Sequence, residues 1–480
     1  MSSLQEFYYT RPRNAALLIG AGLAVVGVAM GALLGFTGPI ITLAVVVALA
    51  GGLLALRSLE LGLWGVVGVI CLLPFATLPI KIVITPTFLN LVMGGMLAVY
   101  VLQWMTLKRR KLAATPAHPL IVVYAVFAVF AFVMGMDNGP LTSTIARRFA
   151  EFVLTIGFGL VIVDVVRDEG HLEELTRVIL LAGLGAAVIG IGLWLLPDNL
   201  ANRALNLLVP LGYPGGDVLR YIEDNPELGE RAIGTSVDPN SYGGLLTMMG
   251  ALVAPQLVAK KPLFGSVWVA RGMFGVIVLA LLLTQSRAAM AGLVAAMGLI
   301  AVLRYRSLLV WMGVGGLLIL VLPVTQGYVA RFVAGFQGAD LATQMRFGEY
   351  KDAFTLLSRY PVFGVGFLGT PDVDIYLGVS NAYLALAQKM GYVGLAVFLA
   401  AIAGVFVYGF VNRKAVYAQA RLSSLWLGWY AGLAGILVVG IFDHYFVNVD
   451  FQPAQTIFWL FVGLALATTR MAVGKADEGP

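Results

Sequence analysis

Long apolar runs, separated by short polar breaks, follow one another along almost the whole chain. A membrane span needs about 20 mostly apolar residues, and in lipid only a helix pairs every backbone polar group of such a run. We therefore predict an all-α, polytopic integral membrane protein with about fourteen transmembrane helices. The predicted spans lie near residues 14–36, 39–56, 60–80, 87–107, 119–135, 150–166, 177–197, 241–259, 270–284, 287–303, 308–324, 391–411, 423–442 and 454–470.

Two stretches between these runs are too long and too polar to be simple turns. One is a loop near residues 198–240, and the other is the segment 325–390, between the eleventh and twelfth predicted spans. In the second, apolar side chains recur at helical spacing ahead of Pro361, which indicates an amphipathic helix that lies on the membrane or caps a cavity. These side chains are Phe347, Tyr350, Phe354 and Leu357. Ser380 is expected to cap the helix that follows.

Basic residues indicate the orientation, because lysine and arginine collect on the cytoplasmic side of a membrane. With a cytoplasmic N-terminus, the basic clusters at 108–111, 260–261 and 304–306 all fall inside. We expect a bacterial inner-membrane protein with both termini in the cytoplasm and a first span that serves as an uncleaved insertion signal. The expected order is a cytoplasmic tail 1–13, spans one to eleven over 14–324, an external helical segment 325–390, spans twelve to fourteen over 391–470, and a cytoplasmic tail 471–480.

The composition supports an integral membrane protein, and the absence of known motifs argues against several kinds of chemistry. Of the 480 residues, 60% are hydrophobic and only 12% are charged, whereas a soluble protein carries roughly 25% charged residues. The single cysteine, Cys71, rules out an intramolecular disulfide. The sequence contains no HExxH or paired-cysteine metal motif and no phosphate-binding loop. We therefore expect no metal, no cofactor, no ATP hydrolysis and no nucleic-acid partner.

Arg287 is the first candidate for chemistry, because it stands between two long apolar runs. A charge at that depth is costly unless it has a partner. Either the side chain reaches up to the lipid headgroups, or it faces a cavity that holds an anion. We favour the cavity, because a planar guanidinium binds two phosphate oxygens at once.

Three further arginines stand close to predicted helix starts. Arg147 and Arg148 lie at the start of one span, where they are either interfacial anchors or anion ligands. Glu151 lies four residues after Arg147, at the spacing that allows an ion pair on a helix. Arg231 precedes an Asp-Pro-Asn turn that ends at Asn240. A helix that begins there, beside an arginine, would form an anion site, although a plain loop arginine is the alternative.

His444 is the candidate base. The chain has three histidines, and only His444 falls on the outer side, next to Asp443. Histidine exchanges a proton near neutral pH, and a neighbouring carboxylate tunes it. The alternative is a structural residue in an interfacial aromatic belt.

Four segments in order, at residues 231–246, 281–293, 346–369 and 380–398, together with the segment DHYFVNVDFQPAQTIFW that begins at Asp443, carry a family resemblance. The chain resembles the O-antigen ligase and O-antigen polymerase superfamily over roughly residues 140–470. This resemblance implies a membrane-embedded glycosyltransferase of the GT-C type, which takes an undecaprenyl-diphosphate-linked glycan on the extracytoplasmic side.

The resemblance also implies that Arg231, Arg287 and Arg346 hold the diphosphate. Our working hypothesis adds Arg147 or Arg148 in support, and it gives Arg287 and Arg346 a catalytic role. His444 or Asp443 assists the acceptor hydroxyl, unless the good diphosphate leaving group makes a strong base unnecessary. The remaining residues that we expect to bind substrate are Asn240, Tyr350, Ser380 and Asn381.

One departure from the family bears on the acceptor, which is another glycan in polymerases and lipid A core or a different surface molecule in ligases. Ligases typically carry His-Asn where this chain has Ser380-Asn381. The change favours a polymerase, for which a chain-length regulator is a candidate partner, and makes His444 a candidate replacement base.

Two other classes stay open. A transporter or lipid flippase would share the many spans, but the chain shows no internal repeat of the kind common in transporters. A peptidoglycan polymerase would carry an acidic residue in a long external loop, for which Asp372 and Asp374 are candidates.

Overall fold

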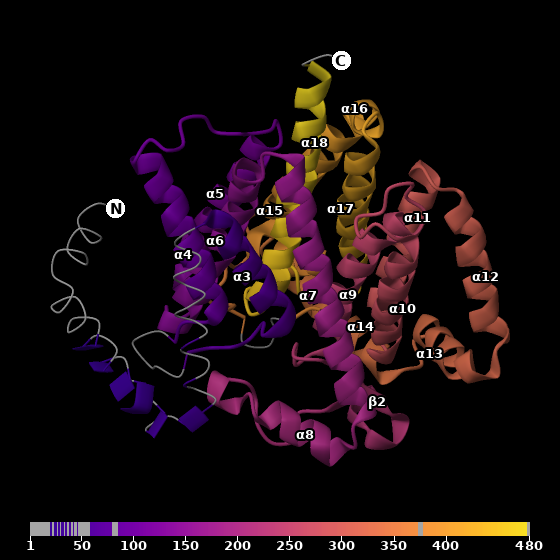
Figure 1. The fold of residues 1–480 in the computed structure, drawn as a ribbon. Coiled ribbons are helices and arrows are strands. Elements are labelled where there is room, and N and C mark those ends of the chain that lie inside the picture. The colour runs from indigo at the N-terminus through magenta and orange to yellow at the C-terminus, as the bar shows by residue number, and fades with distance from the viewer. Residues whose placement is uncertain are drawn as a thin grey trace.

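The computed structural model describes residues 58–78, 85–372 and 378–477, with scattered positions between 20 and 46. The first two predicted spans lie mainly outside these residues, and Asp374 lies outside them too. The described chain is almost entirely helical (Figure 1). Its helices are α3 (Leu59–Leu72), α4 (Phe88–Met105), α5 (His118–Met134), α6 (Ser143–Val165), α7 (Glu169–Leu195), α8 (Asp198–Asn206), α9 (Pro239–Val253), α10 (Val267–Leu283), α11 (Arg287–Leu303), α12 (Ser307–Val321), α13 (Gln326–Phe336), α14 (Leu341–Arg359), α15 (Ala382–Val411), α16 (Arg413–Tyr417), α17 (Ala420–Val439) and α18 (Gln452–Asp477).

The strand content of the described residues is one small hairpin. Strands β1 (Arg220–Tyr221) and β2 (Glu230–Arg231) pair antiparallel, with Arg220 opposite Arg231. The prediction of a helical protein is confirmed, and this hairpin lies within the predicted external loop.

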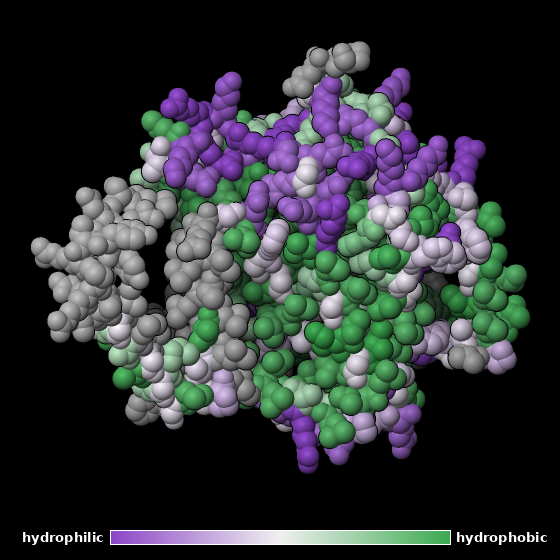
Figure 2. Space-filling model, viewed as in Figure 1, coloured by the Kyte–Doolittle hydropathy of each residue, from purple (hydrophilic) through white to green (hydrophobic). Residues whose placement is uncertain are grey.

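Several helices have the length and composition of membrane spans. Five of the described helices qualify, α4, α7, α15, α17 and α18, and α12 with α13 forms a bent pair that qualifies as one more. Figure 2 shows a broad apolar band across the molecule, with hydrophilic residues gathered at the end where α16 and the C-terminus lie. The chain is an integral membrane protein, but the predicted number of about fourteen spans is not confirmed.

The centre of the bundle is formed by α17 and α18, whose side chains are largely buried. Helix α17 packs against α9 and α11, and α18 packs against α6. Helices α6 and α18 cross so closely that a Cβ added at Gly463 would lie 2.5 Å from the carbonyl oxygen of Gly159. Small residues at such crossings let membrane helices approach, since lipid supplies no hydrophobic drive for their association.

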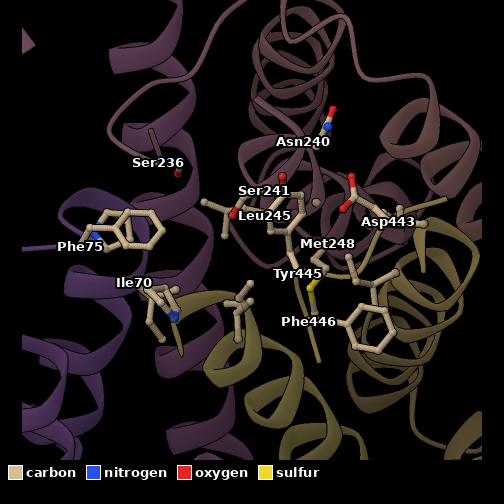
Figure 3. Close-up of a pocket in the computed structure, with 17 residues that line it drawn as sticks. Ile70, Phe75, Ser236, Asn240, Ser241, Leu245, Met248, Asp443, Tyr445 and Phe446 are labelled. Atoms are coloured by element: carbon tan, nitrogen blue, oxygen red, sulfur yellow. The ribbon is translucent and has the colours of Figure 1, made fainter. Parts of the chain in front are cut away.

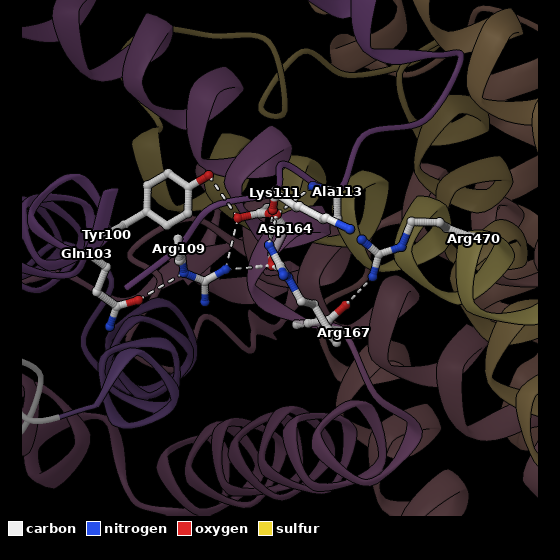
Figure 4. Close-up of polar contacts among 9 residues, drawn as sticks. Tyr100, Gln103, Arg109, Lys111, Ala113, Asp164, Arg167 and Arg470 are labelled. Carbon is white, nitrogen blue, oxygen red and sulfur yellow. Dashed lines mark hydrogen bonds and ion pairs between the residues drawn. The ribbon is translucent and has the colours of Figure 1, made fainter. Parts of the chain in front are cut away.

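A satisfied ion cluster ties the helices together at the α16 end (Figure 4). The fully buried Asp164 carboxylate accepts hydrogen bonds from Arg109 at 2.9 Å, Arg167 at 2.5 Å and the Tyr100 hydroxyl at 3.1 Å. A buried charge is stable only when its partners saturate it. Because every described group around Asp164 is paired, we interpret this cluster as a structural contact that stabilises the packing of the helices.

Three helices begin ahead of the apolar runs from which we predicted membrane spans. Helix α6 begins at Ser143, ahead of the run at 150–166, α7 begins at Glu169, ahead of 177–197, and α15 begins at Ala382, ahead of 391–411. An apolar run marks only the part of a helix that lies in hydrocarbon, whereas each of these helices continues for turns that carry polar side chains. In α15 the helix passes a non-helical residue, Gly391 with φ 68°, where a side chain would strike the Val362 carbonyl.

The amphipathic helix of the long segment exists as α14, and it ends at Arg359, ahead of Pro361 as predicted. Its predicted apolar face is only partly right. Ala353, Leu356 and Leu357 are buried, whereas the side chains of Phe347 and Phe354 are 60% and 56% exposed. The expectation that Ser380 caps the next helix is wrong, because the Asn381 side chain accepts the backbone N–H groups of Tyr383 and Leu384.

Candidate substrate site

Four arginines converge on one cavity of about 290 Å³ at the end of the bundle that carries α8. They are Arg231, Arg287, Arg331 and Arg346. Asp340 also lines this arginine cavity, and the exposed Glu223 and Asp224 stand at its rim. The family resemblance grouped Arg231, Arg287 and Arg346 as diphosphate ligands, and all three line this cavity.

Arg231 is held by the backbone around it. Its Nε donates to the Thr284 carbonyl at 3.0 Å and its Nη2 donates to Asn240 Oδ1 at 2.7 Å. Asn240 stands in the first turn of α9, which Asp238 caps as the Asp-Pro-Asn pattern predicted. Burial lowers the pKa of Arg231 from its ordinary value, and the nearby Asp238 opposes that effect. These contacts aim a charged guanidinium into the cavity.

Arg287 opens α11, directly after a break at Gln285, whose φ is 56°. Its Nη1 donates to the Arg331 carbonyl at 2.9 Å and pairs with the Asp340 carboxylate. Asp340 caps α14. Burial works against ionisation of Asp340, but its hydrogen bonds from Arg287 and Thr343 outweigh burial and hold its pKa at about 2. Arg287 therefore joins α11, α13 and α14 as well as lining the cavity.

The other two cavity arginines differ in their bonding. Arg331 donates to Gln285 Oε1 at 2.6 Å. Arg346, on α14, is half-buried and forms no ion pair or hydrogen bond within the described part of the chain. A half-buried guanidinium without a protein partner is available to an anionic ligand.

Asp443 and His444, in the loop between α17 and α18, face different cavities. Asp443 lines a narrow, mostly apolar cavity that also contains Asn240, the residue it shares with the arginine cavity (Figure 3). Burial and repulsion from Asp238 raise the pKa of Asp443 to about 8, although Arg346 and Arg231 oppose the shift. At neutral pH this carboxyl is mainly protonated.

His444 lines a third cavity of about 270 Å³, which we call the Lys389 cavity. Its Nδ1 lies 3.5 Å from Asp443 Oδ1, and its backbone N–H donates to the same oxygen at 2.8 Å. Burial, aided by the charge of Lys389, lowers the pKa of His444 below 6.5. The imidazole is therefore neutral at pH 7, which is the form that can accept a proton.

Arg147 and Arg148 lie apart from the arginine cavity. Arg147 pairs with Glu151 at 2.7 Å, as the spacing predicted, and Asn90 also donates to Glu151. Arg148 pairs with Asp450 at 2.6 Å and lines the Lys389 cavity. The structure does not bring either residue to the group formed by Arg231, Arg287 and Arg346.

Tyr350, Ser380 and Asn381 make scaffold contacts and line none of the three cavities. The Tyr350 hydroxyl is 3.2 Å from the Ile441 carbonyl, and Asn381 Nδ2 donates to that carbonyl at 2.8 Å. The backbone N–H of Ser380 donates to Glu349 at 2.8 Å. These contacts hold α14 and α15 against the loop that carries Asp443 and His444.

The structure also places Asp372, the acidic loop residue considered for a peptidoglycan polymerase, and it bears on metal binding. Asp372 pairs with Arg359 at 2.8 Å and lines none of the three cavities. Among the described residues, no group of three or more histidine, cysteine or acidic side chains is arranged to hold a metal ion.

The fold and the site together define an integral membrane protein with an arginine-lined cavity at one end of its helix bundle. Residues 272–399 match the family described as O-antigen ligase, which confirms the resemblance to the O-antigen ligase and polymerase superfamily. The matched residues run from α10 into α15 and include Arg287, Arg331 and Arg346. Comparison with curated proteins finds no match.

Proposed function

We propose that this protein is a glycosyltransferase that polymerises undecaprenyl-diphosphate-linked oligosaccharides on the outer side of the bacterial inner membrane. The observation that carries the proposal is the convergence of Arg231, Arg287, Arg331 and Arg346 on one cavity, with Arg346 left without a described partner. A diphosphate carries several oxygens that accept charge-assisted hydrogen bonds, which arginine forms in pairs. The family match supplies the class of substrate.

The orientation follows from charge. The basic clusters at 108–111, 260–261 and 304–306 adjoin the α16-end termini of α4, α10, α11 and α12. The positive-inside tendency makes that end cytoplasmic. The arginine cavity then opens on the extracytoplasmic side, at the level of the lipid headgroups.

In the proposed reaction, the donor's diphosphate occupies the arginine cavity. A hydroxyl oxygen of the acceptor sugar attacks the anomeric carbon of the donor, and His444 takes the hydroxyl proton. The bond between the anomeric carbon and the phosphate oxygen breaks as the new glycosidic bond forms, and undecaprenyl diphosphate leaves. Arginines aimed at the departing oxygens stabilise the charge that builds there, an effect worth about 3 kcal/mol for one well-placed donor.

Asp443 supports this arrangement by staying protonated. Its carboxyl feels both Arg231 and Arg346 and has a pKa of about 8. A neutral carboxyl adds no negative charge beside a diphosphate, whereas an ionised one would repel it. In this proposal Asp443 acts next to the bound donor, and the following residue, His444, acts on the acceptor.

A ligase is the alternative. It would use the same donor chemistry and transfer the glycan to lipid A core or another surface acceptor. Ser380 stands where ligases typically carry histidine, and this difference is the reason for preferring a polymerase.

The test is a product assay on the purified full-length protein in nanodiscs. It receives its host's undecaprenyl-diphosphate oligosaccharide without any nucleotide sugar, and products are resolved by size. A ladder of longer lipid-linked glycans, with release of undecaprenyl diphosphate, supports the polymerase. Transfer that requires an added lipid acceptor supports the ligase instead. If a native donor yields no transfer in either format, the glycosyltransferase assignment is wrong and a transporter becomes the better reading.

A further inference from the structure

The Lys389 cavity is built from four separate parts of the chain. Helix α6 contributes Arg148 and Phe149, α15 contributes Gln388 and Lys389, and the loop between α17 and α18 contributes His444 and Asp450. The fourth wall is the backbone of residues 366–369 and 378–379. None of these residues lines the arginine cavity. The two cavities are therefore distinct sites.

The part of this fourth wall at Gly366 is closely packed against the fold. Gly366 has φ 80°, and a Cβ there would lie 2.5 Å from the Cα of Gly135, so the turn is pressed against the end of α5. Asn138 Nδ2 donates to the Val365 carbonyl at 2.7 Å. A cavity bounded by a pinned turn keeps its shape, which favours recognition of a ligand of defined form.

Two side chains of this cavity carry a buried polar atom that forms no hydrogen bond within the described part of the chain. Gln388 is only 3% exposed and its Nε2 forms no hydrogen bond. His444 Nδ1 forms none either, although it lies 3.5 Å from Asp443 Oδ1. Buried polar atoms in native structures are almost always hydrogen-bonded, and exceptions call for a reason such as a ligand. Both residues line the cavity, so their side chains are the ones that a ligand with hydroxyl groups would engage there.

The charges of the cavity do not balance. Arg148 and Asp450 pair with each other at 2.6 Å. Lys389 has no carboxylate within ion-pairing distance among the described residues, and its ammonium group lies 5.5 Å from the centre of the Phe367 ring. Because Arg148 and Asp450 pair with each other, Lys389 is the basic side chain of the cavity that has no ion-pair partner among the described residues.

The size and the walls suit a sugar. A volume of about 270 Å³ holds roughly nine waters at 30 Å³ each, which is comparable with a pyranose ring and its substituents. Phe149 and Phe367 form an aromatic wall, with ring centres 5.0 Å apart. Aromatic faces pack against the C–H face of a sugar, while the polar groups take its hydroxyls.

We propose that the Lys389 cavity binds an acidic sugar of the acceptor glycan, with Lys389 paired to the sugar's carboxylate and Gln388 bonded to its hydroxyls. This inference rests on the proposed function, because it assigns the acceptor to the His444 side of the loop and the donor to the Asp443 side. It adds the class of acceptor, an oligosaccharide that carries a negatively charged residue next to the hydroxyl that reacts.

The decisive experiment measures binding, which does not depend on turnover. A glucuronic-acid disaccharide and its carboxyl-reduced counterpart are titrated onto the full-length protein in phosphatidylcholine nanodiscs. We expect the acidic probe to bind at least tenfold more tightly. Lys389→Met should remove that preference and Lys389→Arg should keep it. Lys351→Met, which removes an exposed lysine outside the cavity, is the matched control.

Three outcomes would overturn the proposal. Equal binding of the two probes by the unmodified protein would do so, and this comparison stands even if Lys389→Met fails to fold. Retained preference in folded Lys389→Met would show that another group reads the charge. Loss of the acidic probe when phosphatidylglycerol is added to the nanodiscs would identify a lipid headgroup as the occupant.

A parallel transfer assay separates this proposal from the proposed function. Lys389→Met should raise the KM for an acidic acceptor about tenfold, with donor binding unchanged. If the unmodified protein binds the acidic probe selectively but transfers no glycan, the glycosyltransferase assignment fails and the acidic-sugar site stands.

Discussion

Arg346 differs from the other cavity arginines because its guanidinium makes no hydrogen bond or ion pair with the described part of the chain. Arg231 and Arg287 each hold backbone or side-chain partners that belong to the fold, and Arg331 binds Gln285. Removing any of these three would loosen a helix junction as well as the cavity. A loss of activity in such a variant would have two explanations, and Arg346 avoids this ambiguity.

We predict that Arg346→Ala lowers the rate of glycan transfer by about 10²–10³-fold and leaves the unfolding temperature unchanged. Arg346→Lys should recover only part of the rate, because an ammonium group cannot bind two phosphate oxygens in a fork. Lys351→Ala, in the same helix and exposed, is the control and should transfer normally. Wild-type activity in Arg346→Ala would exclude this arginine from the donor site.

The pH dependence should show two separate groups. His444 acts as a base only when neutral, and its pKa lies below 6.5, so the rate should fall only as the pH drops through that lowered value. Asp443, with a pKa of about 8, ionises as the pH rises, and the new negative charge beside the arginine cavity should then raise the KM for the donor.

Two variants check this assignment. His444→Gln should lose most of the rate and the acid limb with it. Asp443→Asn should keep the rate and hold the KM for the donor constant through pH 8. An alkaline rise in KM that persists in Asp443→Asn would assign it to a different group.

At the scale of elements, the site depends on how α14 and α15 are tied to the loop after α17. Asn381 both caps α15 and bonds the Ile441 carbonyl, two residues before Asp443. Tyr350 reaches the same carbonyl from α14. The polar residues that looked like substrate ligands in the sequence therefore position the loop that carries the reacting groups.

We predict that Asn381→Ala destabilises the protein by about 1–2 kcal/mol, the usual cost of a lost helix cap. Ser380→Ala should have no measurable effect on stability, because its side chain makes no hydrogen bond with the described residues. Thermal unfolding in detergent, followed by tryptophan fluorescence, compares the two. A larger loss for Ser380→Ala would mean that the cap belongs to Ser380 after all.

The apolar pattern predicted helices well, and it predicted their ends where a helix is apolar throughout. The run at 287–303 coincides with α11, and the runs near 423–442 and 454–470 correspond to α17 and α18. The first turns of α15 were predicted as a separate helix after Ser380, because Gln388 and Lys389 interrupt the apolar run, yet both residues line a cavity inside the protein. Hydropathy cannot tell a polar residue facing water from one facing a polar cavity.

The site was predictable as far as residue type allowed. Arg287 and Arg231 stood out because each adjoins a membrane run or a turn signature. Arg331 has no such neighbour, and only the folding of α13 over the start of α11 brings it to the cavity. Asp443 and His444 line different cavities. This difference depends on the geometry of the loop, which their adjacency in the sequence does not reveal.

At the scale of the whole molecule, the proposed reaction requires the two ends of the bundle to face different compartments. The basic clusters at 108–111, 260–261 and 304–306 lie at the α16 end, and the arginine cavity lies at the α8 end (Figure 1). The chain offers a clean way to test this, because its single cysteine, Cys71, is buried. A cysteine introduced at an exposed position would be the reactive thiol that reports its side.

We predict that Glu227→Cys, in the loop between β1 and β2, reacts with a membrane-impermeant maleimide added to intact cells whose outer membrane has been permeabilised. Lys261→Cys, exposed at the α16 end, should react only after the inner membrane is broken. Normal glycan transfer by both variants serves as the control for folding. The reverse pattern would place the arginine cavity in the cytoplasm, where it could not serve a polymerase acting on glycans already carried across the membrane.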